Sequence, residues 1–297
     1  IPTAAYQGFT DAASAKAYVD KQGAPIVIKA DGLAAGKGVI VAETTEQAHA
    51  AIDDMLADNK FGDAGSRVVI EQFLQGEEAS FICMIDGDNI LPMATSQDHK
   101  RAFEGDTGPN TGGMGVVTPV TLMPRVSQQM ETQIVLPTIH AMNREKRRFS
   151  GFLYAGLMLT QQGPRVIEFN CRLGDPETQP LLLRMKSDIV PLLMATAEGK
   201  LDTVDAPEWD PRVAVCVVAC SGGYPGSYKK NVPIFGLDRI DTGPDLQGFH
   251  AGTRLAGRDL VTNGGRVFAV TALGADINTA RQRAYDALEK VEFEGMH

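Results

Sequence analysis

Pro164–Gln179, with the sequence PRVIEFNCRLGDPETQ, is the stretch around which the chain is organised. Between residues 166 and 172 apolar and polar side chains alternate, which is the pattern of a half-buried strand. We expect the two faces of this strand to differ in character. The apolar face has Ile167, Phe169 and Cys171, and the other face has Glu168, Asn170 and Arg172.

The polar face of this strand has the groups that a polyanion with a divalent cation requires. Alternate residues lie about 6.5 Å apart, so Glu168, Asn170 and Arg172 can reach one such ligand. Carboxylate and amide oxygens suit magnesium, and a guanidinium suits phosphate. Residues 174–179 (GDPETQ) then add two carboxylates and a proline at a plausible helix start. The alternative is an edge strand with a solvated face, but this concentration of acids favours a site.

Composition is that of an ordinary globular protein. A length of 297 residues with 43% hydrophobic residues suggests two domains, with a third not excluded. The net charge of −9 argues against a nucleic-acid partner, and no apolar run is long enough to span a membrane. The basic run at residues 144–148 is expected to be the polar end of a helix.

The four cysteines, at positions 83, 171, 216 and 220, form no CxxC pair and have no Cys/His spacing typical of zinc. We therefore expect four buried thiols in a reducing, cytoplasmic environment.

The remaining patterns predict a mixture of helices and strands, with a domain boundary at the composition shift over residues 199–211. Helices are expected over 11–21, 44–58, 126–148 with a break at Pro137, 176–185, 189–198 and 278–290. Strands are expected over 25–30, 39–42, 67–74, 77–85, 90–95, 152–160, 213–219 and 267–273.

A glycine-rich loop, residues 31–38 (DGLAAGKG), separates the first two of these strands. It does not fit the P-loop pattern, because only three residues separate Gly32 from Gly36, and Gly38 replaces the hydroxyl residue. A loop between antiparallel strands can still cover phosphates with its backbone N–H groups and Lys37. A plain hairpin is the alternative.

Two further segments are candidate binding elements. Glu71 and Glu78 flank a turn where a nucleoside could insert, although exposed strand-end carboxylates would look the same. The basic run at residues 99–101 precedes EGDTGPNTGGMG (104–115), which has five glycines. We expect a functional loop there rather than a disordered linker.

The order of these motifs resembles the ATP-grasp superfamily. More narrowly, four stretches are similar to the phosphoribosylamine-glycine ligase (glycinamide ribonucleotide synthetase) family: KADGLAAGKGV (29–39), QDHKRAFEGDTGPNTGGMG (97–115), EFNCRLGDPETQ (168–179) and VTNGGRV (261–267). The resemblance covers essentially the whole chain, with Leu173 where Phe is usual. The role of VTNGGRV is left open.

The resemblance implies an α+β ATP-grasp domain over residues 1–198, with two subdomains sandwiching ATP and residues 25–80 forming the nucleotide-covering one. A small β-rich C-terminal domain over 199–297 follows. The family also has an N-terminal α/β domain, with the first ATP lysine upstream, and a short C-terminal tail, and we expect this chain to lack these parts.

The resemblance also implies the roles of individual residues. ATP is assigned to Lys29, Gly32, Gly36, Gly38, Glu71, Leu74 and Glu78. The transferred phosphoryl group is assigned to Lys37 and Arg172, and Mg²⁺, with Mn²⁺ as the other possibility, to Glu168 and Asn170. Glycine and 5-phosphoribosylamine are assigned to His99, Lys100, Arg101, Asn110, Gly113, Asp175 and Glu177.

The implied reaction is an ATP-driven ligation by a monomeric enzyme. Glycine attacks the γ-phosphate to give glycyl phosphate and ADP, and the amine of phosphoribosylamine then displaces phosphate. Two rivals are another ATP-grasp carboxylate–amine ligase, against which GDPETQ and GPNTGGMG argue, and a regulatory module that binds ATP without ligation.

Overall fold

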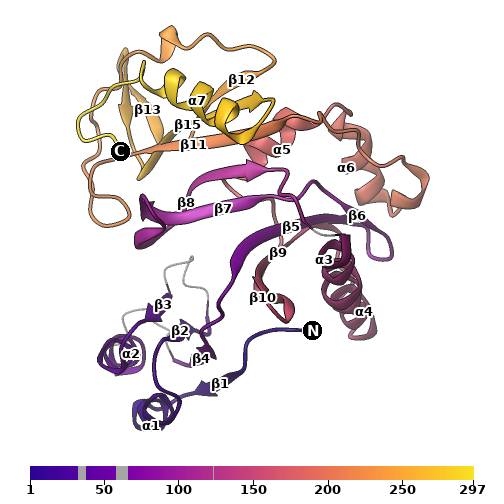
Figure 1. Cartoon of the computed structure of the whole chain (residues 1–297), viewed down its shortest axis with the longest axis vertical. Helices are drawn as coiled ribbons and strands as arrows, with labels where there is room; N and C mark the ends of the chain where they lie inside the picture. The colour runs from indigo at the N-terminus through magenta and orange to yellow at the C-terminus, as the bar shows by residue number, and fades with distance from the viewer. Residues whose placement is uncertain (33–37, 58–65, 123) are drawn as a thin grey trace. The chain divides into compact units, whose positions relative to one another are not determined.

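The structure, a computed structural model, describes residues 1–32, 38–57, 66–122 and 124–297. These residues form two compact units, and each is described by itself (Figure 1). Unit 1 comprises Ile1, Glu78–Leu157 and Glu168–His297, and unit 2 comprises Pro2–Glu77 and Met158–Ile167. No helix in the described ranges is long and apolar enough to cross a membrane.

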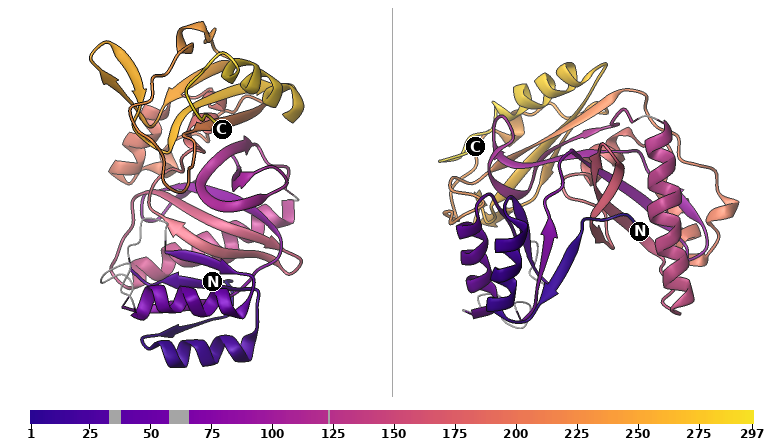
Figure 2. Two further views of the ribbon diagram at one scale, coloured as in Figure 1. Left: turned by 90° about the vertical axis from the view of Figure 1, so that its left-hand side faces the viewer. Right: turned by 60° about the horizontal axis from the view of Figure 1, so that its bottom comes forward.

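Unit 2 is built on a four-stranded sheet in the order β1-β4-β2-β3. Its strands are β1 (Tyr6–Phe9), β2 (Ile26–Ala30), β3 (Val39–Ala42) and β4 (Val68–Gln72). Helices α1 (Ala12–Gln22) and α2 (Thr45–Ile52), the latter continued by a π-helical turn (Asp53–Ala57), lie side by side on one face of this sheet (Figure 2). The predicted antiparallel pairing of β2 with β3 is confirmed.

The helix ends of unit 2 are where the sequence predicts them. Asp11 caps α1 by accepting a hydrogen bond from the Ser14 N–H, and Gly23 ends it with a φ of 79°. Thr44 caps α2 in the same way through Gln47.

Unit 1 contains most of the remaining elements. One sheet has the order β10 (Gly163–Asn170), β9 (Gly151–Thr160), β5 (Glu77–Ile85) and β6 (Ile90–Pro92). Residues 158–160 of β9 and 163–167 of β10 are counted with unit 2. A five-stranded sheet has the order β12 (Leu246–His250), β15 (Arg266–Gly274), β11 (Val213–Cys220), β8 (Thr107–Thr118) and β7 (Gln97–Phe103). Strands β13 (Thr253–Ala256) and β14 (Asp259–Thr262) pair with each other.

The helices of unit 1 are α3 (Pro124–Gln129), α4 (Leu136–Arg144), α5 (Thr178–Arg184), α6 (Ile189–Glu198) and α7 (Ile277–Leu288). Short helical turns lie at Met130–Val135 (π), Leu201–Thr203 and Leu237–Arg239 (both 3-10). Helix α7 lies along β15 and β11, where Phe268, Val270 and Leu288 share one apolar core (Figure 1).

A long helix is present as predicted over much of 126–148, but the predicted break at Pro137 is wrong: α3, the π-helical turn and α4 follow one another without a gap, and Gln129, Val135 and Leu136 at their junctions all have α-helical backbone angles. Helix α3 passes into the π-helical turn, and Pro137 lies in the first turn of α4. A proline has no N–H to donate, and the first turn of a helix is where that loss is tolerated.

The predicted functional loop at residues 104–115 is wrong as a description of the backbone. Most of it is β8, which pairs with β7 and leaves only residues 104–106 as the turn. The glycines suggested a loop, but the structure uses them locally: Gly105, Gly108 and Gly113 have φ values of 70°, 83° and 114°. Register shifts near His99 and Arg101 accompany them.

The predicted apolar face of the strand at residues 166–172 is wrong at the C-terminal end of that strand. Strand β10 ends at Asn170, so Arg172 lies outside it. Phe169 is 38% exposed and Cys171 is also exposed, whereas Val166, on the opposite face, is buried. Since β10 is the edge strand of its sheet, its end has less cover than an internal strand has. Cys171 therefore differs from the other three cysteines, which are buried as predicted.

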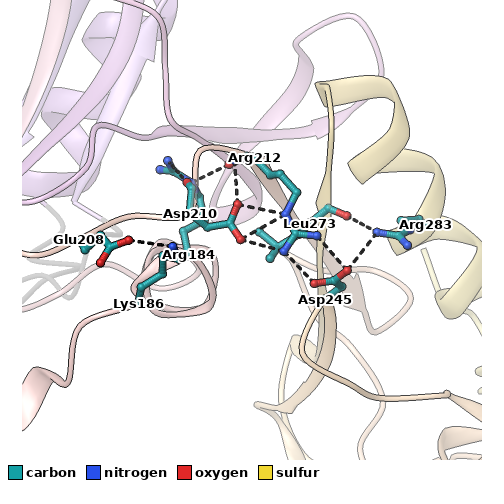
Figure 3. Close-up of polar contacts among 8 residues, drawn as sticks. All are labelled: Arg184, Lys186, Glu208, Asp210, Arg212, Asp245, Leu273 and Arg283. Carbon is teal, nitrogen blue, oxygen red and sulfur yellow. Dashed lines mark hydrogen bonds and ion pairs between the residues drawn. The ribbon is translucent and has the colours of Figure 1, made fainter.

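A network of arginines joins α5 to the segment that precedes β11 (Figure 3). The buried Arg184 guanidinium donates to the Arg212 carbonyl (2.8 Å), to Thr118 Oγ1 (3.2 Å) and to the Asp210 carbonyl (2.8 Å). Arg212 in turn binds the carboxylates of Asp210 and Asp245. Hydrogen bonds from Arg212 lower the pKa of Asp210 to about 2. The network thus fixes residues 208–212 with charged hydrogen bonds.

Candidate active site

Lys29 is a cation of unit 2 that two partners hold in place. The antiparallel pairing of β2 with β4 places Lys29 close to Glu71, and the Lys29 Nζ to Glu71 Oε2 distance is 2.7 Å. Lys29 also donates to the Ile167 carbonyl at 3.0 Å, and Ile167 immediately precedes Glu168 in the sequence. The Lys29 side chain is only 16% exposed, so a largely buried positive charge is held near the C-terminal end of β2.

The structure describes some of the other residues of unit 2 that are predicted to bind the nucleotide. The Ala30 N–H donates to the Gly38 carbonyl at 2.8 Å and continues the β2–β3 hairpin toward the glycine-rich stretch, of which Gly32 is also described. Leu74 follows β4 and is half-buried. Gly36 and Lys37 lie outside the described residues.

Glu168 and Asn170 lie at the C-terminal end of β10, on the same face of the strand. Among the residues that the structure describes, neither side chain has a hydrogen-bond or ion-pair partner, and Glu168 is exposed. Gly156 of β9 leaves room for Glu168, because a Cβ there would lie 3.0 Å from Glu168 Cγ. A carboxylate and a carboxamide with uncommitted oxygens fit the preferences of Mg²⁺. Arg172 donates to the Leu173 carbonyl.

A buried hydrogen-bonded group surrounds Glu177, which is 2% exposed. Its Oε1 accepts hydrogen bonds from Ser80 Oγ (3.0 Å) and Tyr154 Oη (2.9 Å). Burial, reinforced by the Glu177 charge, raises the pKa of Tyr154, which keeps the phenol protonated as a donor. Gly174 leaves room for this carboxylate, since a Cβ at position 174 would displace Glu177 Oε2. The carboxylate of the GDPE turn is thus rigidly held.

Lys100 lies between two acids on β7 and β5. Its Nζ is 2.8 Å from Glu78 Oε2 and 3.9 Å from Asp98 Oδ2. Burial acts to lower the pKa of Lys100, but Glu78, Tyr154 and Asp98 outweigh it and the pKa is raised. Lys100 is therefore a permanent cation in this part of unit 1.

Asp98 is the buried acid of the same group, with a side chain that is 5% exposed. Its Oδ1 has no hydrogen-bond partner among the described residues. Burial, together with the Glu177 charge, raises the pKa of Asp98 to about 8, although Lys100 opposes the shift. Near neutral pH this carboxyl group is therefore largely protonated, unlike an ordinary aspartate.

Asp98 is expected to make stability fall as pH rises. Its pKa is raised from 3.8 to about 8, so the folded state binds one more proton than the unfolded state between these values. The contribution is complete below pH 4 and is lost toward pH 8, with a slope of up to about 1.4 kcal/mol per pH unit. Urea denaturation of wild type and Asp98→Asn between pH 5 and pH 8.5 should show the variant gaining relative stability with pH. A difference in stability between the two proteins that stays constant with pH would contradict this prediction.

The structure divides the predicted run His99, Lys100 and Arg101 between two environments. Lys100 joins Glu78 and Asp98, whereas His99 and Arg101 line a separate hollow of about 540 Å³. Side chains alternate along a strand, so neighbours in β7 cannot all point to one ligand. Arg101 Nη1 also donates to the Gly108 carbonyl at 2.6 Å. Asn110 is exposed and pairs with Arg101 across the hairpin.

Sequence reasoning missed four residues that complete this group: Ser80, Asp98, Tyr154 and Arg266. Arg266 binds the carboxylate of Asp175 with an Nη2 to Oδ2 distance of 3.0 Å. The signals were present for two of them, since Asp98 lies in QDHKR and Arg266 in VTNGGRV. Nothing in the local pattern distinguishes Ser80 or Tyr154 from other strand residues.

Comparison with known proteins defines first the class of protein. The profile of the phosphoribosylglycinamide synthetase ATP-grasp (A) domain matches residues 1–178, and that of the C domain of the same synthetase matches residues 214–297. The fold and the candidate site are therefore those of an ATP-grasp ligase. More particularly, the chain belongs to the phosphoribosylamine–glycine ligase family.

Individual relatives agree with this assignment. The chain is 56% identical to phosphoribosylamine–glycine ligase of Vibrio vulnificus strain YJ016, over 100% of its own length and 69% of the relative's. It is 57% identical to the Salmonella typhimurium ligase, over 99% and 69% of the two chains. The crystal structure of the Thermotoga maritima ligase is 33% identical, with a TM-score of 0.89 over 100% of this chain and 73% of that one.

Proposed function

We propose that the residues described above carry out the ATP-dependent ligation of glycine to 5-phosphoribosylamine, which gives glycinamide ribonucleotide, ADP and phosphate in purine biosynthesis. The observation that supports this site most directly is the pair of uncommitted oxygen donors, Glu168 and Asn170, on a strand that continues into the rigid GDPE turn. A family match that extends over both ends of the chain supports the same reaction.

The nucleotide residues divide by the part of ATP that they would contact. The phosphates are assigned to Gly32, Gly36, Lys37 and Gly38. Lys29 is assigned to both a phosphate and the adenine edge. Glu71 and Leu74 are assigned to the adenine edge, and Glu78 to the ribose hydroxyls. The Lys29 side chain supports its assignment, because it is largely buried and already fixed by Glu71. Glu78 uses one oxygen for Lys100, so its second oxygen is the one available to a hydroxyl group.

Glu168 and Asn170 would hold the divalent cation, and Mg²⁺ is the ion that this oxygen donor set suits best, with Mn²⁺ as the other candidate. A bound cation supplies charge neutralisation on the transferring phosphoryl group. Arg172 is assigned to the same phosphoryl group, since a guanidinium matches its oxygens.

Glycine and phosphoribosylamine are assigned to the remaining site residues: Lys100, Asp175, Glu177, Gly113, His99, Arg101 and Asn110. In the first step a glycine carboxylate oxygen attacks the γ-phosphorus and ADP leaves. In the second step the amine nitrogen attacks the glycyl carbonyl carbon, inorganic phosphate leaves and the nitrogen loses a proton. Neither step requires a protein nucleophile, so fixed charges and positioning supply the catalysis. The buried acids and Lys100 are such fixed groups.

The proposed domain limits are 1–198 for the ATP-grasp domain, with the nucleotide-covering subdomain at 25–80, and 199–297 for the C-terminal domain. The separate profile matches at 1–178 and 214–297 support a boundary between them. We propose a cytoplasmic monomer that acts on small molecules, which fits the acidic composition.

Phosphate release by the full-length protein that carries this sequence tests the proposal. With ATP and Mg²⁺, we expect release only when glycine and freshly generated phosphoribosylamine are both present. Release that depends on bicarbonate in place of glycine would identify a different carboxylate–amine ligase. ATP binding without release under any of these conditions would identify a regulatory module.

A further inference from the structure

Arg266, at the start of β15, forms an unusual set of contacts for a side chain that no part of the proposed chemistry uses. Its Nη1 donates to the carbonyl groups of Gly112 (2.7 Å), Gly113 (3.4 Å) and Asp175, and its Nη2 donates to Asp175 Oδ2 at 3.0 Å. The side chain is 22% exposed. One guanidinium therefore connects β15 with the β7–β8 hairpin and with the GDPE turn.

A second contact from the same region holds the hairpin independently. Tyr224 Oη accepts a hydrogen bond from the Gly112 N–H at 2.9 Å. Tyr224 packs over Gly265, where a Cβ would lie 2.1 Å from its ring. Both backbone polar groups of Gly112 are thus hydrogen-bonded: its N–H to Tyr224 and its carbonyl to Arg266.

The two segments that Arg266 joins are the ones to which acceptor substrates are assigned. Gly113 has a φ of 114° and packs against Asp98, so that a Cβ there would lie 2.7 Å from Asp98 Oδ1. Asp175 lies two residues before the buried Glu177. A shift of the hairpin against the turn would therefore change the spacing of Gly113, Asp175 and the Lys100 group together.

We propose that Arg266 is a positioning residue for the ligation, one that fixes residues 112–113 of β8 against Asp175 so that glycine and phosphoribosylamine are bound in reactive geometry. This inference rests on the proposed function and assigns a role to the VTNGGRV motif. A planar guanidinium is suited to the task because it donates in several directions at once, whereas a lysine ammonium is a compact point charge. The ion pair between Arg266 and Asp175 is partly exposed, so its contribution to the free energy of unfolding is small.

The test compares Arg266→Ala and Arg266→Lys with wild type in the full-length protein. Misplacement of substrate by about 1 Å can cost about a hundred-fold in rate. For Arg266→Ala we expect kcat/KM for glycine and phosphoribosylamine to fall about 10- to 100-fold, while the Kd for ATP and the Tm stay close to wild type. Arg266→Lys should recover part of the loss, and added guanidinium at low millimolar concentration should partly rescue the alanine variant.

Arg254→Ala is the matched control. Arg254 makes a similar forked contact, to Asn231 Oδ1 at 3.1 and 2.5 Å, but touches none of the proposed substrate residues, so its variant should keep wild-type kinetics. If Arg266→Ala fails to fold, Tyr224→Phe removes one hydroxyl acceptor and should shift the same acceptor parameters about 3- to 10-fold.

Several results would overturn the inference. One is a kcat/KM for glycine and phosphoribosylamine that stays at the wild-type value in Arg266→Ala. A second is a loss of ATP affinity in Arg266→Ala as large as its loss of kcat/KM. A third is a rate that neither Arg266→Lys nor added guanidinium restores. Failure of the proposed function itself is distinguishable, because wild type would then release no phosphate in response to glycine and phosphoribosylamine.

Discussion

Replacement of Glu168 by Gln is expected to lower kcat at least about a hundred-fold, which is the scale on which removal of one preorganised electrostatic group acts. The carboxylate is one of only two side-chain oxygen donors assigned to the cation, and a neutral amide binds Mg²⁺ more weakly. Because Glu168 is exposed and makes no hydrogen bond with any described residue, the thermal unfolding midpoint should be unchanged. The measurements are steady-state phosphate release over a range of Mg²⁺ concentrations and a thermal melt.

Glu289→Gln is the control for this variant. Glu289 is an exposed acid that follows α7, and its loss changes the net charge by the same amount without touching an assigned residue. Its rate should equal that of wild type. A Glu168→Gln enzyme with a near-normal rate and an unchanged Mg²⁺ requirement would remove Glu168 from the cation site.

Replacement of Arg184 by Ala is expected to cost about 3–5 kcal/mol of unfolding free energy, the range for breaking a buried charged interaction by removing one partner. Arg184 is 4% exposed, and its three hydrogen bonds satisfy two backbone carbonyls and the buried Thr118 hydroxyl. Removing the guanidinium leaves these acceptors without a donor and opens a cavity beside Trp209, over which it lies at 5.9 Å. Urea denaturation monitored by tryptophan fluorescence would measure the loss.

Lys186→Ala provides the comparison two residues away. Its ammonium pairs with Glu208 at 2.7 Å, but the two side chains are 52% and 70% exposed (Figure 3). An ion pair this exposed is screened by water and contributes little to the free energy of unfolding. If both variants lost the same small amount, the buried Arg184 network would not be the stabilising feature that its geometry indicates.

Prediction from sequence was most successful where local chemistry sets the structure. The starts of α1 at Ala12 and of α2 at Thr45, and helix α6 at Ile189–Glu198, all follow from patterns within a few residues of each position. The ATP-grasp fold itself came from the resemblance, which the family match confirms.

Prediction was weaker where contacts between distant parts of the chain determine the local structure. Glycine content suggested a loop at 104–115, but pairing with β7 makes most of it a strand, and such pairing is a tertiary effect. The edge position of β10, which exposes Phe169 and Cys171, depends on sheet order and is likewise invisible locally.

The candidate site shows the same limit. Motif reading placed His99, Lys100 and Arg101 together, whereas strand alternation separates Lys100 from the other two. The contacts of Glu177 with Ser80 and Tyr154 span 97 and 23 positions in sequence, so no spacing rule could have found them.

The exposed thiol of Cys171 makes the protein convenient for site-specific labelling. Cys83, Cys216 and Cys220 are buried, and burial raises the pKa of Cys216 and of Cys220 to about 12, so these thiols form little reactive thiolate. A maleimide dye would therefore attach at one position without mutagenesis. That position adjoins Asn170, which makes the dye a direct optical reporter of events at the end of β10.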